Sequence, residues 1–251
     1  MKIIIVLLIT LSTFQNAIAH YVLSRFIANE TIFPEWKYVR RVTPNTTTPL
    51  AEHTYPHYDI SSPNIRCGRG AGTSGPGSEI ATVVAGSVVG FRLDLWNAPY
   101  VMFHDGPLLA YMSKSPEQTR DGLKEYDGGG EWFKIAQRGP YNKTRWFAEY
   151  NKRFSEFNFT VPPTTPPGFY LLRGESIYPH DTFNRTQFYM NCASVEIVGG
   201  IESESEPGPL VRFPGAYDDY DEGIWVPGEV WNRTDLSRYK MPGPEIWGAG
   251  V

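Results

Sequence analysis

His20 is the residue with the most distinctive chemical potential in this chain, because it follows a stretch typical of a cleavable leader. Residues 1–19 contain one early cation, Lys2, then an apolar run over residues 3–10 and a small-x-small triplet that ends at Ala19, which is the pattern that signal peptidase recognises. Cleavage there would make His20 the first residue of the mature chain. An N-terminal histidine offers its α-amine and its Nδ1 together, so it can chelate one metal ion through two nitrogens.

A second imidazole would complete a site with three nitrogen ligands. His104 is the candidate, since it lies at the end of a loop in Phe103-His104-Asp105-Gly106-Pro107, directly before an apolar run. Three nitrogens in a T suit Cu(II) and leave positions open for an oxygen species. A lone loop histidine is more often a surface group, so the pair carries more weight than either residue. His53 and His57 are four apart, but Pro56 excludes a helical metal pair, and we interpret both as loop residues.

Gln187 and Tyr189 open a predicted strand that continues to Cys192. Because side chains alternate along a strand, these two share one face while Phe188 is predicted to point into the sandwich. Tyr189 could approach a copper ion axially as a weak ligand, and Gln187 could hydrogen-bond an oxygen species. The alternative is an ordinary buried tyrosine whose hydroxyl is satisfied by the protein.

The rest of the composition indicates a secreted protein. The two cysteines, Cys67 and Cys192, are an even count and predict one disulfide in an oxidising compartment. The chain has 23 basic and 27 acidic side chains, a balance that argues against nucleic acid or an anionic membrane as a partner. No segment approaches the apolar length of a membrane-spanning helix. Predicted glycosylation sites are the Asn-x-Ser/Thr asparagines Asn29, Asn45, Asn142, Asn158, Asn184 and Asn232.

The elements that must position these residues are predicted to be strands. Val89, Phe91, Leu93 and Leu95 alternate with polar residues and glycine, and similar short runs recur. The predicted strands cover residues 21–28, 79–84, 87–96, 107–112, 131–136, 156–161, 168–175 and 186–198. With 24 glycines and 21 prolines the chain is hostile to long helices. We therefore predict an all-β fold, an antiparallel immunoglobulin/fibronectin-like β-sandwich with long loops, in one domain over residues 20–251. Residues 207–251 are expected to form a long ordered loop over the sandwich.

An ordered series of motifs resembles the fungal lytic polysaccharide monooxygenases of auxiliary activity family 9. Besides His20, the series consists of Trp36-Lys37-Tyr38-Val39-Arg40-Arg41, Ile65-Arg66-Cys67, His104-Asp105-Gly106-Pro107 with Leu109-Ala110-Tyr111-Met112, Trp132-Phe133-Lys134-Ile135, Gly168-Phe169-Tyr170-Leu171-Leu172-Arg173, Gln187-Phe188-Tyr189 with Cys192, Phe213-Pro214-Gly215-Ala216-Tyr217, and Pro242-Gly243-Pro244. The resemblance implies a single catalytic domain without a carbohydrate-binding module. It also implies copper-dependent oxidative cleavage of a β-1,4-glucan, cellulose or a related polymer, at C1 and/or C4.

Carried over residue by residue, the resemblance assigns the copper ligands to His20 and His104, with Tyr189 as the axial group. It places His180 and Gln187 in the second sphere of the metal, and it pairs the two cysteines. One copper ion per chain is implied, together with a small-molecule or enzymatic electron donor, and hydrogen peroxide or dioxygen as the co-substrate. The protein is expected to act as a monomer, outside the cell.

Tyr239 matches a position where the family often places an exposed ring beside the metal, and such a ring can stack on a sugar. The alternative is a ring packed on the sandwich. Three departures from the family pattern concern the surroundings of the metal and not its ligands. Gly68 stands where asparagine is frequent, Gly174 stands where a bulkier residue is common, and His180 is only seven positions from Gln187.

Two other functions compete with the enzyme interpretation. A secreted copper-binding protein could use the same two histidines without oxidising a polysaccharide. However, a copper carrier needs neither Gln187 nor Tyr189, so the presence of both favours catalysis. A lectin-like sandwich would explain the many aromatic residues but not the position of His20.

Overall fold

The computed structural model describes residues 20–43, 54–93, 101–102, 104–150, 155–201 and 206–248, without the side chains of residues 149 and 150. The predicted leader, His53 and the glycosylation site Asn45 lie outside these residues. Among the described residues, none of the helices has the length and hydropathy that a membrane crossing requires.

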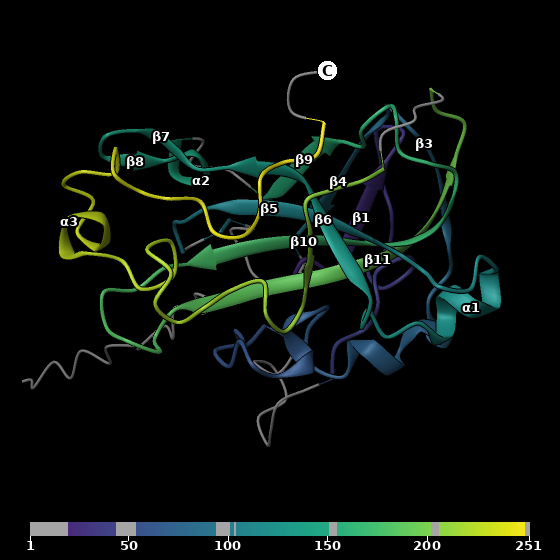
Figure 1. Cartoon of the computed structure of the whole chain (residues 1–251), viewed down its shortest axis with the longest axis horizontal. Coiled ribbons are helices and arrows are strands. Elements are labelled where there is room, and N and C mark those ends of the chain that lie inside the picture. The colour runs from purple at the N-terminus through teal and green to yellow at the C-terminus, as the bar shows by residue number, and fades with distance from the viewer. Residues whose placement is uncertain are drawn as a thin grey trace, which may run out of the picture.

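Two β-sheets form the body of the molecule (Figure 1). The larger sheet has the strand order β12 (Leu210–Arg212), β6 (Glu131–Arg138), β5 (Leu108–Lys114), β10 (Gly168–Tyr178), β11 (Gln187–Val198) and β3 (Ala81–Val84). The smaller sheet has the order β2 (Thr31–Ile32), β1 (Arg25–Ala28), β4 (Val88–Arg92) and β9 (Glu156–Thr160). The predicted β-sandwich is therefore confirmed, with one difference: β3 pairs with β11 in parallel, whereas the other pairs are antiparallel.

Short elements decorate the loops. They are the hairpin β7 (Pro140–Asn142) and β8 (Arg145–Trp146), the helices α1 (Arg120–Glu125), α2 (Phe147–Tyr150) and α3 (Gly228–Trp231), and the 3-10 turns η1 (Pro63–Ile65), η2 (Ala71–Thr73) and η3 (Gly75–Gly77). The tail beyond residue 206 runs over the larger sheet as expected, adding β12, α3 and a parallel bridge from Lys134 to Ile246.

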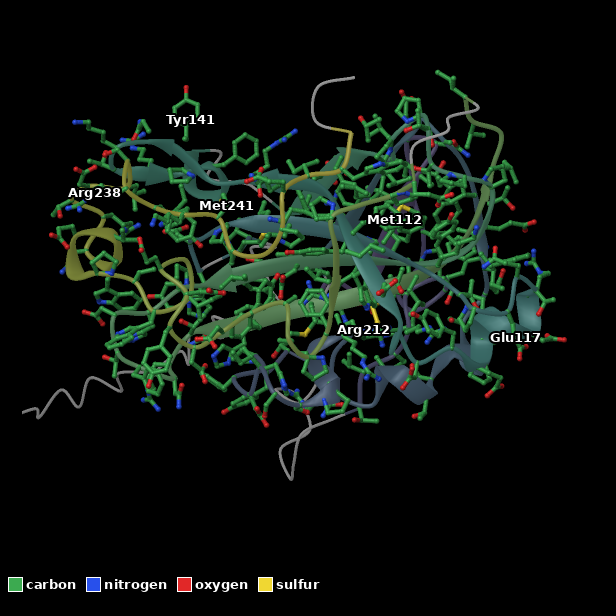
Figure 2. All side chains as sticks on the ribbon, in the orientation of Figure 1. Met112, Glu117, Tyr141, Arg212, Arg238 and Met241 are labelled. Atoms are coloured by element: carbon green, nitrogen blue, oxygen red, sulfur yellow. A yellow bond between two sulfur atoms is a disulfide. The ribbon has the colours of Figure 1, made fainter. Side chains whose placement is uncertain are left out.

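The core lies between the two sheets, and its alternation follows the sequence. Val89 and Phe91 of β4 and the following Leu93 are at most 1% exposed. Met112 of β5 is fully buried and lies within the packed interior, whereas Glu117 and Arg238 lie at opposite ends of the molecule (Figure 2). Alternating inward side chains from facing sheets thus fill one interior, as in other β-sandwiches.

Gly174 explains one departure from the family pattern by packing. It lies in the middle of β10, and a Cβ built on it would overlap the ring of Phe91, which reaches across from the smaller sheet. Interiors are packed too closely to absorb such an overlap. The absence of a side chain at residue 174 is therefore what gives Phe91 its position.

A buried ion pair next to Gly174 stabilises β10 and the tail. Arg173 and Glu175 form two hydrogen bonds of 2.7 and 2.6 Å with no side-chain exposure. Arg173 also donates to the carbonyls of Ile65 and Arg66, and Glu175 accepts from the hydroxyl of Tyr217 at 2.5 Å. We call these residues the Arg173–Glu175 network. Its carboxylate and guanidinium each find several partners, as buried charges require.

The β10–β11 hairpin determines where the predicted site residues meet. Its register pairs Ser176 with Tyr189 and Tyr178 with Gln187. β5 begins at the same end, since Leu108 pairs with Ser176. The loop that contains His104 therefore ends beside the start of β11. A disulfide joins Cys67 to Cys192, in agreement with the expectation, and ties the η1–η3 segment to the same strand.

Candidate metal centre

Three predicted residues meet at this end of the sandwich. The ring centroids of His20 and His104 are 5.8 Å apart, those of His104 and Tyr189 are 5.8 Å apart, and those of His20 and Tyr189 are 6.4 Å apart. The three residues come from the segment before β1, the loop before β5 and the start of β11. Three segments that are far apart in the sequence therefore bring these rings together, as the copper prediction requires.

The imidazole of His104 is in the protonation state that metal binding requires. Its Nε2 is buried and has no hydrogen-bond partner among the described residues. Burial, and then the charge of His20, lower the pKa of His104 to about 4, so the ring is neutral and keeps a free lone pair. A buried polar atom without a partner costs about 1–3 kcal/mol, and a metal ion would satisfy it.

His20 is suited to share that ion. Burial lowers its pKa as well, so both imidazoles are neutral, the form that binds metal. One ion can join two rings at this spacing, because metal–imidazole bonds are about 2.0–2.1 Å long. In the described part of the chain, no group of three or more His, Cys, Asp or Glu residues could hold a metal. The donor set that remains, two imidazoles and a phenol, fits copper.

Tyr189 is fixed from two sides. Its ring stacks on Tyr21 at 4.3 Å, and Tyr21 is held in turn by a 2.8 Å hydrogen bond to Ser176. Its hydroxyl donates to Oε1 of Gln187 at 2.5 Å. Burial raises the pKa of Tyr189 far above its usual range, so the phenol stays protonated. The predicted common face of Gln187 and Tyr189 is therefore observed as a direct contact, and the amide nitrogen of Gln187 has no hydrogen-bond partner among the described residues. The predicted inward position of Phe188 is wrong, because Tyr189 packs in the core between the two sheets, whereas Phe188 packs on the opposite face of the larger sheet, against Tyr217 of the tail.

His180 lies beyond the immediate group. Its ring stacks on Trp231 of α3 at 4.0 Å, and its Nδ1 accepts from the backbone of Thr182 at 2.9 Å. Tyr178 lies between this pair and the centre, 5.1 Å from Trp231 and 4.5 Å from His104. Within the described residues, no hydrogen bond or ring contact joins His180 to Gln187 or Tyr189. The short connection that follows His180 keeps the histidine beside α3.

Tyr239 is half-buried near the hairpin β7–β8. Its hydroxyl donates to the carbonyl of Gly223 at 2.8 Å, and its ring meets Trp146 edge to face at 4.7 Å. Part of the ring is open to solvent, so both the substrate role and the packing role stay compatible with its position.

Sequence reasoning missed three aromatic neighbours of the centre. The ring centroid of Tyr55 lies 5.0 Å from that of His20. The ring of Tyr178 contacts both His104 and Trp231. Tyr178 occupies the register position opposite Gln187, a signal that strand pairing could have given. Nothing in the spacing of Tyr55 or Trp231 indicates their contacts, which depend on how loops fold back.

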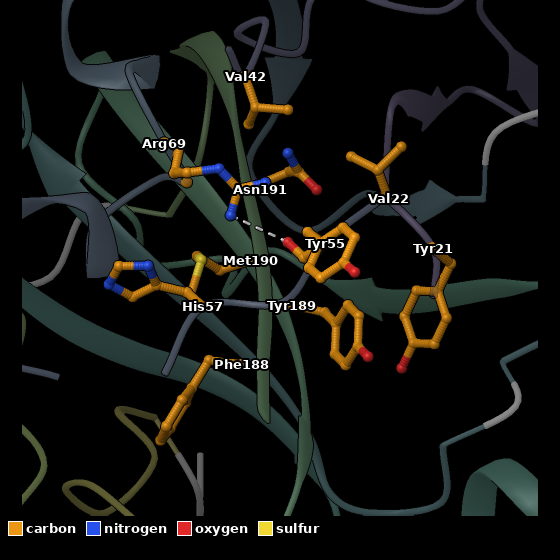
Figure 3. Close-up of a pocket in the computed structure, with 11 residues that line it drawn as sticks. Tyr21, Val22, Val42, Tyr55, His57, Arg69, Phe188, Tyr189, Met190 and Asn191 are labelled. Carbon is orange, nitrogen blue, oxygen red and sulfur yellow. Dashed lines mark hydrogen bonds between the residues drawn. The ribbon is translucent and has the colours of Figure 1, made fainter. Parts of the chain in front are cut away.

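A cavity of about 20 Å³, large enough for one water, lies behind Tyr189 (Figure 3). Tyr21, Tyr189, Asn191 and Arg69 are among its lining residues, and Arg69 holds Tyr55 in place by donating to its carbonyl at 3.2 Å.

Gly68 also lines this cavity. Its φ is +99°, and a Cβ built on it would lie 2.6 Å from a side-chain carbon of Val42. Both the backbone and the space therefore require glycine at this second departure from the family pattern.

Comparisons with known proteins point to one family. The sequence model of Auxiliary Activity family 9 (formerly GH61) matches residues 20–239. An AA9 family lytic polysaccharide monooxygenase U of Thermothielavioides terrestris is 41% identical over 92% of this chain and 93% of its own length. A monooxygenase C of Emericella nidulans is 36% identical over 95% of this chain and 96% of its own length. The crystal structure of HiLPMO9B has the same fold, with a TM-score of 0.72 at 24% identity, over 91% of this chain and 99% of that chain.

Proposed function

The chain belongs to Auxiliary Activity family 9, a family of secreted, copper-dependent oxidoreductases that cleave polysaccharides oxidatively, and from this premise we propose that its substrate is a β-1,4-glucan. Cellulose or a related polymer would be oxidised at C1 and/or C4. The observation that supports the proposal is the convergence of the rings of His20, His104 and Tyr189, together with a buried Nε2 of His104 that has no hydrogen-bond partner in the described part of the chain.

We propose that His20, through Nδ1, His104, through Nε2, and the more weakly binding Tyr189 would hold one copper ion. After removal of a leader over residues 1–19, the α-amine of His20 would be the third nitrogen. The match to the family model begins at residue 20, which supports maturation at that point. When bound, copper supplies the one-electron chemistry by which hydrogen peroxide or dioxygen is activated, with electrons from a small-molecule or enzymatic donor.

The side chains around the metal would have separate tasks. Burial keeps both imidazoles neutral and therefore able to bind the metal. Gln187 accepts the hydroxyl proton of Tyr189 through Oε1, so its amide N–H groups are free to orient an oxygen co-substrate. The Nδ1 of His180 lies 2.9 Å from the backbone nitrogen of Thr182 and 3.1 Å from Oδ1 of Asp181, so Nε2 would be the ring nitrogen that acts on the co-substrate. We infer a second-sphere role for both residues.

The remaining features complete the proposal. Residues 20–251 would act as a single secreted catalytic domain, as a monomer. Tyr239 would contribute to sugar binding with the open part of its ring. Five of the predicted glycosylation sites belong to the described residues, and all five are exposed: Asn29, Asn142, Asn158 on β9, Asn184 and Asn232.

The decisive experiment incubates copper-loaded mature protein with cellulose and a reductant, and analyses the soluble products by mass spectrometry. Oxidised oligosaccharides are expected, and the position of the added oxygen distinguishes C1 from C4 oxidation. Metal-stripped protein is the control. A protein that binds copper tightly but releases no oxidised product from any glucan would instead be a copper-binding protein.

A further inference from the structure

Exposed aromatic side chains concentrate in one region of the described surface. The exposed aromatic residues are Tyr55, Tyr58, Tyr141, Phe183, Tyr220 and Trp225. Three of them touch one another: the ring of Phe183 lies 5.2 Å from that of Tyr220 and 5.3 Å from that of Trp225, and the last two are 6.0 Å apart. We call these three residues the aromatic cluster. A contiguous exposed patch of this kind indicates a binding surface more often than an accident of packing.

The aromatic cluster is attached to the connection between β10 and β11. Trp225 forms a parallel bridge with His180, and its Nε1 donates to the carbonyl of Asp181 at 2.9 Å. Thr186 fastens the same two segments, since its hydroxyl donates to the carbonyl of Ile224 at 2.6 Å. The two ends of this connection are Tyr178 and Gln187, which both border the metal centre. The aromatic cluster therefore adjoins the metal centre on its His180 side.

The geometry of the rings suits a sugar. Trp225 meets Phe183 and Tyr220 at angles of 75° and 64°, so the contacts are edge to face and leave ring faces free. Tyr220 is 70% exposed and Trp225 is 41% exposed. Open ring faces stack on the apolar C–H faces of pyranose units.

The surrounding charges favour a neutral polymer. Asp181, Asp218 and Asp219 lie on the same segments, and the pKa of Asp219 is raised by burial and then by the charges of Asp218 and Asp59. Such a group repels a polyanionic glycan, whereas carboxylates accept hydrogen bonds from the hydroxyls of a neutral one.

We propose, resting on the proposed function, that the aromatic cluster is a contact surface for a neutral β-glucan chain beside the metal centre. It anchors the polymer on the His180 side, through the segment whose Gly223 carbonyl accepts the hydroxyl of Tyr239, while the ring of Tyr239 packs against Trp146. Two other occupants are separate outcomes of the test. One is an N-glycan on Asn184, which directly follows Phe183; the other is a second copy of the chain.

The test measures adsorption of the copper-loaded protein to microcrystalline cellulose without reductant. Tyr220→Ala and Trp225→Ala should each weaken adsorption about two- to tenfold, the range expected for one aromatic stacking contact. Trp225→Phe should recover most of the loss. Tyr141→Ala is the matched control, because the exposure of Tyr141, 48%, lies between those of Trp225 and Tyr220 and its side chain points outward from β7, outside the cluster (Figure 2). Copper electron paramagnetic resonance spectra should not change in any of these variants, and the melting temperature should not change in Tyr220→Ala. Trp225→Ala and Trp225→Phe both lose the hydrogen bond to Asp181, so a difference in adsorption between these two variants reports the ring alone.

Three results would overturn the inference. Unchanged adsorption of both alanine variants would show that the aromatic cluster does not touch the polymer. Stronger adsorption of Asn184→Gln, with no effect of the cluster variants, would show that a glycan covers it. A wild-type dimer that Tyr220→Ala dissociates would identify a self-association surface. Because no turnover is involved, these results are independent of whether the wild-type protein oxidises cellulose.

Discussion

The Arg173–Glu175 network of β10 and the loop histidine His104 both place polar atoms out of contact with water, but they differ in one respect. In the Arg173–Glu175 network each charge has several partners within the protein. At the candidate metal centre, by contrast, the Nε2 atom of His104 is buried and has no hydrogen-bond partner among the described residues. A group with all its bonds satisfied can stabilise the fold, but it has nothing left to bind. The centre keeps binding capacity at a cost in stability, and this separates a functional group from a structural one.

The largest effect is expected in the network. Glu175→Gln should lower the free energy of unfolding by about 3–5 kcal/mol, because it leaves the guanidinium of Arg173 buried without its counter-charge. Urea unfolding measures the loss. Glu156→Gln is the control, since the Glu156–Arg92 pair is about one third exposed on each side and should cost no more than about 1 kcal/mol. Equal losses in the two variants would remove the distinction, and copper affinity should be the same in both.

The opposite pattern is expected at the metal centre. His104→Ala should weaken copper binding by more than about a hundredfold, since removing even an outer partner of a ligand typically costs 10–100-fold. Isothermal titration of the metal-free protein measures it. His57→Ala is the control, because His57 pairs with Phe188 by its backbone and is no part of the ligand set. Copper binding that survives His104→Ala would refute the assignment of this ligand.

An N-terminal extension tests the same ligand set without changing a side chain. One extra residue before His20 would turn its amine into an amide and remove one proposed nitrogen ligand. Copper affinity and oxidation should both fall strongly, while melting of the metal-free protein should not change. Full activity of the extended protein would contradict the involvement of the amine.

Tyr189→Phe should give a smaller effect between these extremes. The variant loses one hydrogen bond, to Gln187, so about 1 kcal/mol of stability is at stake. Copper should remain bound, with a changed electron paramagnetic resonance spectrum and slower oxidation. If the spectrum is identical to that of the wild type, Tyr189 is not the axial group.

Tyr239→Ala should have the smallest effect. We expect adsorption to cellulose to weaken no more than about tenfold, as for a single stacking contact, because part of the ring is already buried. Tyr239→Phe separates the two roles, since it removes only the hydrogen bond to Gly223 and keeps the ring. A lower melting temperature of Tyr239→Ala with unchanged adsorption would place the residue in the core.

The sequence predicted long strands and missed what depends on tertiary contact. Each of the eight predicted strands overlaps an observed one, because alternation like that of Val89, Phe91 and Leu93 is a local signal. The ligand candidates could be identified because their chemistry is unusual for their positions. The parallel pairing of β3 with β11, the contact of Trp231 with His180 and the exact place of His180 could not be predicted, since they arise from the paths of loops.

Gly174 has a consequence for how related chains can diverge. Because the ring of Phe91 occupies the space of a Cβ at residue 174, a chain that acquires a larger side chain there must first make residue 91 smaller. A single substitution at residue 174 would produce a steric clash, and a single reduction at residue 91 would leave a cavity. The two positions are therefore expected to change together, so in a saturation library Gly174→His should be recovered mainly alongside Phe91→Ala or a similar reduction.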